Sequence, residues 1–338
     1  MIIVLKPGTT VEETGEVISR IEAKDLKPVV LEGTQRNVIA VIGDERLLEQ
    51  INFESHPYVE SAKPVLSRYK LVSREVRDAD TVVDVAGVPV GGDNFTVIAG
   101  PCSIESLEQM RTTGQAVKDA GATILRGGAF KPRTSPYSFQ GLGVEGLDIF
   151  DEVCTEMSMP GFTEVMEVKD LDPVQERGFG FQVGARNMKN SRLLTAIGKR
   201  DNPVLLKRGM SATIEQLLLA AEYVVAEGNS RVILCERGIT TFETATRNTL
   251  DLNAVAVLKE KTHLPVVVDP SHGTGVRSYV KPLSLAAAAV GADGIIVEVH
   301  NKPEEALSDG QQSLYPEQFT ELMRALRPVV EAVGRKLV

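Results

Sequence analysis

Short apolar runs alternate with longer amphipathic segments from Phe95 to the end of the chain. The runs are rich in Val, Ile, Leu and Phe, which predicts buried parallel strands, and the segments between them repeat apolar residues at helical spacing. Eight strands are predicted, at Phe95 to Ala99, Thr123 to Arg126, Gly161 to Val165, Phe181 to Gly184, Val204 to Lys207, Val232 to Cys235, Val266 to Asp269 and Gly294 to Val297.

Eight helices are predicted to follow these strands. They are placed at Leu107 to Ala120, Gly146 to Met157, Lys169 to Arg177, Ser191 to Lys199, Ile214 to Glu227, Asp251 to Lys261, Ser284 to Ala289 and Pro316 to Val333. Eight strand–helix units in about 240 residues are typical of a (β/α)₈ TIM barrel. A doubly wound sheet is the alternative, but no Gly-x-Gly-x-x-Gly turn follows the first strand.

The first 64 residues have a different pattern, that of a small α+β domain. A β-rich run, Ile2 to Leu5, precedes a helix predicted at Thr10 to Glu22, which begins with a capping Thr and Glu pair. The remaining predicted elements are strands at Pro28 to Leu31, Val38 to Ile42 and Tyr58 to Ala62, and a short helix at Glu45 to Ile51. This order predicts a ferredoxin-like domain over residues 1–64. Residues 65–94 are predicted to be a linker and a β-hairpin, and residues 95–338 the barrel.

Composition limits the classes of function. The chain has 338 residues and a formal charge of −9, which argues against a nucleic-acid-binding surface. No apolar run approaches the roughly 20 residues needed to span a membrane, and Met1 to Leu5 leads directly into a Lys-Pro-Gly turn. Three cysteines do not make a disulfide framework in a chain this long. We therefore expect a cytoplasmic protein that does not bind membranes.

A polar or reactive residue follows or ends each predicted strand of the barrel. These residues are, in order, Cys102, Arg126, Glu164, Arg186, Lys207, Arg237, His272 and Glu298. Any one of them has an ordinary explanation, such as a helix cap or an ion pair. Barrel enzymes build their sites at the carboxyl ends of the strands, so eight such residues at one level predict an active site there.

The charges predict what this site binds. The segment Gly127 to Gly143 adds Lys131, Arg133 and Thr134 to the four basic residues at the strand ends. So many cations in one place are unfavourable unless anions lie between them. We infer two anionic groups, interpreted as phosphates, together with a carboxylate.

Closure of the barrel predicts a metal site. The eighth strand pairs with the first in a closed barrel, so Cys102, His272 and Glu298 become neighbours, and Asp309 in the following loop can supply a fourth ligand. A thiolate, an imidazole and two carboxylates suit Mn²⁺, Fe²⁺, Co²⁺ or Zn²⁺. The competing interpretation of Cys102 is a buried thiol that only packs.

The other cysteines and histidines have simpler interpretations. Cys154 and Cys235 are expected to pack in the interior, and His56 and His263 to be solvated beside loops. His300 lies near the predicted site without a clear role.

Six motifs together resemble one enzyme family. They are Ala99-Gly100-Pro101-Cys102-Ser103, Leu125-Arg126-Gly127-Gly128-Ala129, Lys131-Pro132-Arg133-Thr134-Ser135, Gly184-Ala185-Arg186-Asn187, Asp269-Pro270-Ser271-His272 and Val297-Glu298-Val299-His300. The chain resembles, over essentially its whole length, the 3-deoxy-D-arabino-heptulosonate 7-phosphate (DAHP) synthases that carry an N-terminal ferredoxin-like domain. The resemblance implies the first step of the shikimate pathway of aromatic amino-acid biosynthesis, a metal-dependent condensation of phosphoenolpyruvate with erythrose 4-phosphate that releases phosphate.

The resemblance also implies residue roles. Arg186, with its neighbour Ala185, Lys207 and Arg237 would bind the phosphoenolpyruvate phosphate. Arg126 and Lys131 would lie near its carboxylate, and Arg133 and Thr134 would bind the phosphate of erythrose 4-phosphate. Cys102, His272, Glu298 and Asp309 match the metal ligands. Lys131 is the expected proton donor, and Glu164 is expected to help place the attacking water.

Two other functions compete with this interpretation. The first is 3-deoxy-D-manno-octulosonate 8-phosphate synthase. The corresponding loop of that family resembles Lys-Ala-Asn-Arg-Ser/Thr, whereas this chain has Lys131-Pro132-Arg133-Thr134. The second is a non-catalytic amino-acid sensor, although a relic barrel has no reason to keep four metal ligands and five cationic groups.

The N-terminal domain is expected to regulate the enzyme or to support its assembly. The resemblance implies feedback inhibition by tyrosine or phenylalanine, but the predicted strand Pro28 to Leu31 offers only apolar side chains to such an effector. Oligomerisation is the other interpretation, and we expect a homotetramer.

Overall fold

The computed structural model describes residues 1–31, 36–43, 45–48, 51–63, 68–132 and 135–338. These residues form two compact units, Met1–Asp78 and Ala79–Val338. Each unit has a hydrophobic core of its own. No helix in the described part of the chain is both long enough and apolar enough to cross a membrane.

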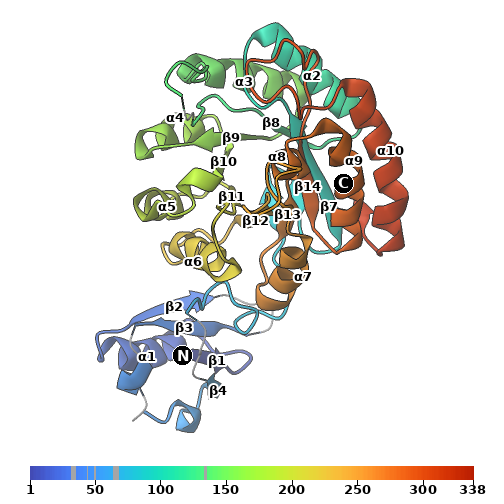
Figure 1. The fold of residues 1–338 in the computed structure, drawn as a ribbon. Helices are drawn as coiled ribbons and strands as arrows, with labels where there is room; N and C mark the ends of the chain where they lie inside the picture. The colour runs from blue at the N-terminus through green and yellow to red at the C-terminus, as the bar shows by residue number, and fades with distance from the viewer. Residues whose placement is uncertain (32–35, 44, 49–50, 64–67, 133–134) are drawn as a thin grey trace. The chain divides into compact units, whose positions relative to one another are not determined.

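The N-terminal unit is an antiparallel sheet with one helix packed against it (Figure 1). The strand order is β2-β3-β1-β4, which confirms the predicted ferredoxin-like arrangement. The elements are β1 (Ile2–Leu5), α1 (Val11–Glu22), β2 (Lys27–Leu31), β3 (Val38–Ile42) and β4 (Val59–Lys63). Thr10 caps α1 in a reciprocal pair with Glu13, because each side chain accepts a hydrogen bond from the other's backbone N–H.

The short helix predicted at Glu45 to Ile51 is described only in part, since residues 49–50 lie outside the described residues. Its described part is a 3₁₀ helix, η1 (Glu45–Leu48), and a second 3₁₀ helix, η2 (Phe53–Ser55), follows. Segments of three or four residues are too short for a stable α-helix, and 3₁₀ geometry is common at such lengths.

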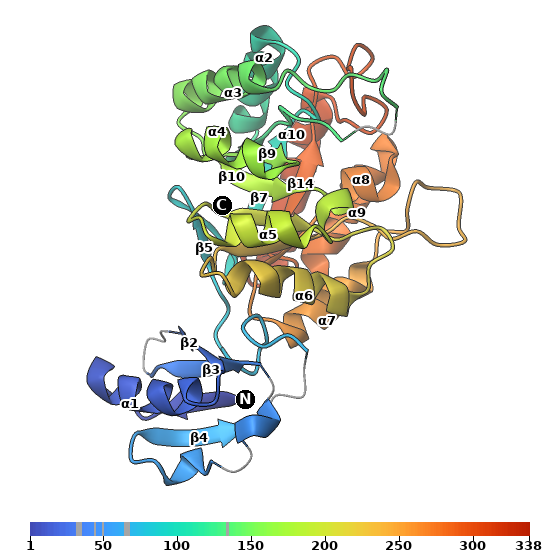
Figure 2. The same ribbon diagram turned by 90° about the vertical axis from the view of Figure 1, so that its left-hand side faces the viewer.

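The second unit is a parallel barrel of eight strands with helices on its outside (Figures 1 and 2). This confirms the predicted fold class. The strands are β7 (Asn94–Gly100), β8 (Ile124–Arg126), β9 (Gly161–Val165), β10 (Gly180–Val183), β11 (Val204–Lys207), β12 (Val232–Glu236), β13 (Val266–Val268) and β14 (Gly294–Glu298). The helices are α2 (Leu107–Asp119), α3 (Val144–Met157), α4 (Leu171–Glu176), α5 (Ser191–Gly198), α6 (Ile214–Val225), α7 (Leu252–Lys261), α8 (Pro270–Thr274), α9 (Arg277–Ala289) and α10 (Pro316–Ala332).

Pairing of β14 with β7 closes the barrel. The register runs from Gly294 opposite Thr96 to Glu298 opposite Gly100. Glu298 therefore lies beside Gly100, the last residue of β7. Cys102 follows Gly100 by two residues. A short strand, β15 (Lys336–Leu337), pairs with the other end of β7.

A β-hairpin packs against the apolar interior of the barrel. It consists of β5 (Val83–Val85) and β6 (Val88–Val90), joined by a turn at Ala86 and Gly87 whose φ values are positive. Val83, Val85 and Val90 pack in one cluster with buried residues of the barrel strands.

Helix α9 begins earlier than predicted, and α8 was not predicted. Pro282 lies inside α9, and we had placed the start of the helix after it. A proline inside a helix removes one backbone hydrogen bond and crowds the carbonyl of the preceding turn, which is why the sequence pattern indicated a later start. The side chain of Asp269 accepts a hydrogen bond from the backbone N–H of His272 and caps α8.

Two histidines are buried rather than solvated as we had expected. His56 is 4% exposed and His263 is 6% exposed. His263 shares a 2.7 Å hydrogen bond with the hydroxyl of Thr81, which satisfies one ring nitrogen in the interior.

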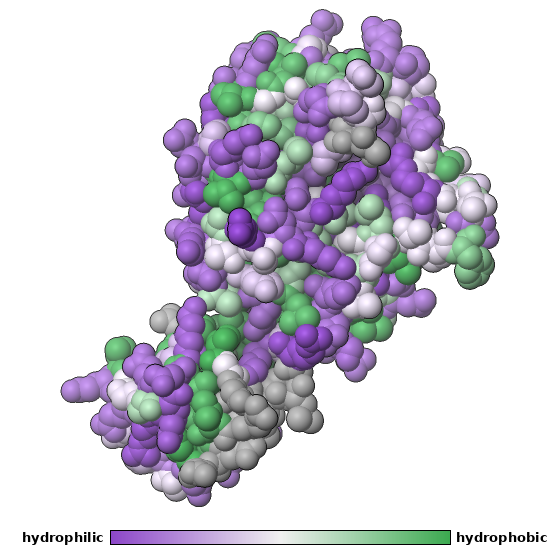
Figure 3. Space-filling model, turned by 60° about the vertical axis from the view of Figure 1, so that its left-hand side comes forward, coloured by the Kyte–Doolittle hydropathy of each residue, from purple (hydrophilic) through white to green (hydrophobic). Residues whose placement is uncertain are grey.

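The surfaces of the two units differ. On the face shown in Figure 3, hydrophobic residues of the barrel unit are scattered among hydrophilic ones, whereas a continuous strip of hydrophobic residues crosses the N-terminal unit. Val30 and Leu47 of the N-terminal unit are 37% and 51% exposed.

Candidate active site

A polar cavity of about 510 Å³ lies at the carboxyl ends of the barrel strands. Six of the eight strand-end residues line it: Arg126, Glu164, Arg186, Lys207, Arg237 and His272. Lys131, Ala185 and Asp309 line it as well. Arg133 and Thr134 lie outside the described residues, so their predicted contact with a phosphate stays a prediction.

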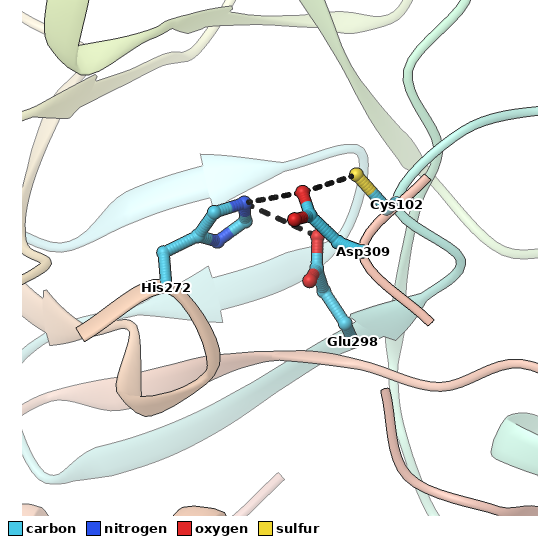
Figure 4. Close-up of side chains that lie close together, drawn as sticks. All are labelled: Cys102, His272, Glu298 and Asp309. Carbon is cyan, nitrogen blue, oxygen red and sulfur yellow. Dashed lines mark hydrogen bonds and ion pairs between the residues drawn. The ribbon is translucent and has the colours of Figure 1, made fainter. Parts of the chain in front are cut away.

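The four predicted metal ligands come together in the structure (Figure 4). One donor atom from each of Cys102, His272, Glu298 and Asp309 lies within 4.8 Å of the others. Nε2 of His272 is 3.2 Å from Oε1 of Glu298 and 3.9 Å from Oδ2 of Asp309. The same oxygen of Asp309 is 3.3 Å from Sγ of Cys102. The side chains thus converge on one point from two loops, the short helix α8 and a strand end.

The orientation of His272 suits a metal ligand. Its Nδ1 is 2.7 Å from Oδ2 of Asp269, and this contact orients the ring so that Nε2 faces the cluster. A carboxylate behind the imidazole is the usual outer partner of a metal-binding histidine. The donor set and this orientation fit a borderline divalent ion.

The ionisation of the other ligands also fits a cation. Burial and the charge of Glu298 raise the pKa of Cys102 to about 12, so the free thiol holds its proton until a cation replaces it. Burial opposes ionisation of Asp309, but the charges of His272 and Arg247 outweigh it and keep the pKa of this carboxyl well below its usual value.

Two buried cations connect the ligands to the cavity. Arg126 is 2% exposed and donates a 2.6 Å hydrogen bond to Glu298. Lys131 is 6% exposed and donates to the carbonyl oxygen and the sulfur of Cys102, at 2.9 and 3.1 Å. A Cβ atom at Gly128 would lie 2.8 Å from Cδ of Lys131, so glycine at this position makes room for the lysine.

Arg237 also lines the cavity and is a candidate anion-binding residue. Its Nη1 is buried and has no hydrogen-bond partner among the described atoms. Burial lowers the pKa of this guanidinium, because charge in the interior is costly without a counter-charge. An oxyanion in the cavity would supply the missing acceptor.

Asp269 links the metal cluster to the basic wall, and sequence reasoning did not single it out. Its Oδ2 accepts from Nζ of Lys207 at 2.6 Å and from His272 at 2.7 Å, and the residue is 1% exposed. Its position directly before His272, at the start of a helix, was the available clue.

Sequence reasoning also missed Gln182, Arg247 and Asn248, which line the cavity. Gln182 lies within β10, where a polar side chain is unusual, and that was its clue. Arg247 is in a long loop and pairs with Asp309 at 3.1 Å, which no spacing rule predicts.

Glu164 lies beside Gly184 at the cavity. A Cβ atom at residue 184 would be 2.0 Å from Oε1 of Glu164, so only glycine leaves space for this carboxylate. Gly184 therefore allows an acidic group to remain among the cations.

Comparisons with known proteins agree with this geometry. The model of the DAHP synthetase I family matches residues 75–333, and that of the DAHP synthase ferredoxin-like domain matches residues 1–67. A phospho-2-dehydro-3-deoxyheptonate aldolase of Thermotoga maritima is 51% identical over 337 residues, which cover all of both chains. A 2-dehydro-3-deoxyphosphooctonate aldolase of Syntrophobacter fumaroxidans is 34% identical over 72% of this chain and 90% of its own length.

Solved structures give the same result. The crystal structure of a DAHP synthase from Thermotoga maritima has a TM-score of 0.80 and 50% identity, and covers 100% of this chain and 99% of that one. A truncated form of the Thermotoga maritima enzyme has a TM-score of 0.75 and 48% identity, and covers 80% of this chain and 99% of that one. With both domains matched and the full length aligned, this chain belongs to the DAHP synthetase I family.

Proposed function

We propose that the chain is a DAHP synthase, a transferase that condenses phosphoenolpyruvate with erythrose 4-phosphate and water to give DAHP and phosphate, the first step of the shikimate pathway. The observation that carries the proposal is a four-ligand cluster at the edge of a cavity lined by buried cations. Family membership supports the same reaction.

The reaction is proposed to depend on a divalent metal ion held by Cys102, His272, Glu298 and Asp309. Their donor atoms suit Mn²⁺, Fe²⁺, Co²⁺ or Zn²⁺. When bound, the ion would act as a Lewis acid on the aldehyde oxygen of erythrose 4-phosphate.

Two groups of basic residues are proposed to bind the two substrates. Arg186, Lys207 and Arg237, beside Ala185, are proposed to bind the phosphoenolpyruvate phosphate, and Arg126 and Lys131 its carboxylate. C3 of phosphoenolpyruvate is then proposed to face the metal cluster. The erythrose 4-phosphate phosphate is assigned to Arg133 and Thr134, as the resemblance implies, and its aldehyde is proposed to lie at the cluster.

The chemistry follows from these positions. C3 of phosphoenolpyruvate attacks the aldehyde carbon, a carbon–carbon bond forms, and Lys131 gives its proton to the developing alkoxide. Positive charge then develops at C2, where a water held by Glu164 adds and loses a proton. Cleavage of the bond between C2 and the phosphate oxygen releases inorganic phosphate and leaves the ketone of DAHP. The basic wall stabilises the departing dianion.

Phosphate release separates this function from its runner-up. Phosphoenolpyruvate with erythrose 4-phosphate is expected to release phosphate, whereas arabinose 5-phosphate in its place is expected to release little. A preference for arabinose 5-phosphate would instead identify a 3-deoxy-D-manno-octulosonate 8-phosphate synthase. Release with neither sugar in the metal-loaded chain would contradict both assignments.

The N-terminal unit is proposed to be a separate regulatory module over residues 1–64, with residues 65–94 as linker and hairpin and residues 95–338 as the catalytic barrel. Its hydrophobic strip supports a role in assembly, and we propose a homotetramer (Figure 3). Tyrosine or phenylalanine is the proposed effector. The absence of disulfides among the three cysteines supports a cytoplasmic location.

Removal of residues 1–64 tests this organisation. The truncated chain is expected to keep catalysis, because every proposed ligand lies beyond Gly100, and to lose any inhibition by tyrosine or phenylalanine that the full chain shows. Initial rates of both chains with and without each amino acid measure this, and light scattering compares their assembly. Inhibition that survives truncation would place the effector site on the barrel.

A further inference from the structure

We propose that Glu105 and His300 form a positioning pair that fixes the two loops carrying Cys102 and Asp309. The inference rests on the metal site proposed above. The two residues are neither metal ligands nor part of the cavity wall. Their contacts join the loop after β7 to the loop after β14.

The carboxylate of Glu105 binds both loops at once. It lies three residues after Cys102, and its side chain is 11% exposed. Its Oε1 accepts a 2.9 Å hydrogen bond from the backbone N–H of Leu307, two residues before Asp309. The same oxygen accepts at 3.1 Å from the hydroxyl of Ser103 in its own loop. One carboxylate therefore sets the spacing between two segments that carry ligands.

His300 orients this carboxylate. The ring is 4% exposed, and its Nδ1 accepts a 3.0 Å hydrogen bond from the backbone N–H of Lys302. Nδ1 therefore carries no proton, so Nε2 is the N–H donor and points at Oε2 of Glu105, 3.4 Å away. Both oxygens of Glu105 are thereby held by the loop after β14, Oε1 through Leu307 and Oε2 through His300.

The segment that the pair holds contains the ligand whose backbone most needs support. Asp309 has φ of +51°, in the left-handed region that a residue with a side chain seldom occupies without neighbours to enforce it. On its far side Arg277 donates to the carbonyl oxygens of Gly310 and Ser313, at 2.7 and 2.5 Å. Glu105 is the matching anchor on the near side.

The anchor also reaches Cys102. Ser308, between Leu307 and Asp309, has its hydroxyl oxygen 3.0 Å from the cysteine sulfur. Release of Leu307 would move Ser308 and Asp309 together relative to the thiol. Loss of a group that hydrogen-bonds a ligand directly typically weakens metal binding about 10- to 100-fold, and Glu105 acts on both ligand-bearing loops one step further out.

Titration of the full-length protein with Co²⁺ alone tests the inference. Affinity is measured by competition with a chelator, and the cobalt–thiolate absorption band reports whether Cys102 is bound. Glu105→Gln is expected to bind Co²⁺ at least about tenfold more weakly, with a weaker band at equal occupancy. Glu108→Gln is the matched control, because it removes the same charge from an exposed position in the first turn of α2. It is expected to behave like the unmodified chain.

His300→Asn provides a second variant that does not alter the acid. Asn can still accept from Lys302 but does not reach Glu105, so Co²⁺ affinity is expected to fall in the same direction. Because the residues act as a unit, the double variant is expected to lose little more than the weaker single variant. With saturating Co²⁺, KM for phosphoenolpyruvate should return to its original value in every variant.

The possible failures are distinct. A missing thiolate band in the unmodified chain would overturn the metal assignment and this inference with it. A normal band there, with unchanged Co²⁺ affinity in both variants, would overturn the positioning pair alone. The pair would also be overturned if weaker Co²⁺ binding came with a lower unfolding temperature of the metal-free variants than of the metal-free unmodified chain. That result would indicate a general loss of stability.

Discussion

Turnover is expected to fall by roughly three orders of magnitude when the enzyme is stripped of divalent metal, and to return when Mn²⁺ is added. A Lewis acid at the aldehyde supplies several kcal/mol of charge stabilisation to the developing alkoxide. The measurement is phosphate release before chelation, after chelation and desalting, and after the addition of Mn²⁺, Fe²⁺, Co²⁺ or Zn²⁺.

Variants of two cysteines separate the metal effect from packing. Cys102→Ala is expected to lose bound metal and turnover together. Cys154→Ala is the control, because Cys154 is also buried but lies in α3, outside the cluster, and its loss should cost only on the order of 1 kcal/mol of stability. Metal content by mass spectrometry accompanies each rate. Full turnover in protein shown to be free of metal would contradict the assignment.

The convergence of Cys102, His272 and Glu298 was predictable because barrel closure is a property of the whole pattern. Eight strand–helix units require β14 to pair with β7, and the observed register places Glu298 opposite Gly100. The residues at the carboxyl ends of the strands must then lie at the same end of the barrel. No detail of side-chain packing was needed for this step.

Asp269, Arg247 and Glu105 could not be assigned in the same way, because their roles depend on distances between loops. Asp269 contacts both Lys207 and His272, and the contact with Lys207 depends on how β11 and α8 lie in three dimensions. Arg247 reaches Asp309 across 62 positions of sequence. Loops of this length have many possible paths, so periodicity carries no information about which ends meet.

Local structure was predictable where its hydrogen bonds are local. The capping box at Thr10 predicted α1 correctly for this reason. The 3₁₀ geometry of Glu45–Leu48 was not predictable in this way, because a segment of four residues has no helical preference of its own and Leu48 packs into the core of the N-terminal unit.

Replacement of Lys131 by Met is expected to lower kcat by about 10²- to 10⁴-fold, the usual contribution of a general acid. Nζ of Lys131 lies 3.1 Å from the sulfur of Cys102 and also faces the cavity, so it is next to the place assigned to the aldehyde oxygen. Burial alone would lower the pKa of Lys131, but the ionised form of Cys102 and the charge of Glu164 outweigh burial and raise it. The residue is therefore an ammonium group at neutral pH and holds the proton that the alkoxide needs.

A second replacement distinguishes proton donation from charge. Lys131→Arg keeps the positive charge, but a guanidinium does not release its proton at this pH, so kcat should remain low while KM for phosphoenolpyruvate stays close to its original value. Lys169→Met is the control, since Lys169 is 75% exposed on the barrel surface. Single-turnover rates measured with saturating metal isolate the chemical step. Recovery of the chemical rate in Lys131→Arg would show that Lys131 acts only through its charge, and the proton would then have to come from water or from another group in the cavity.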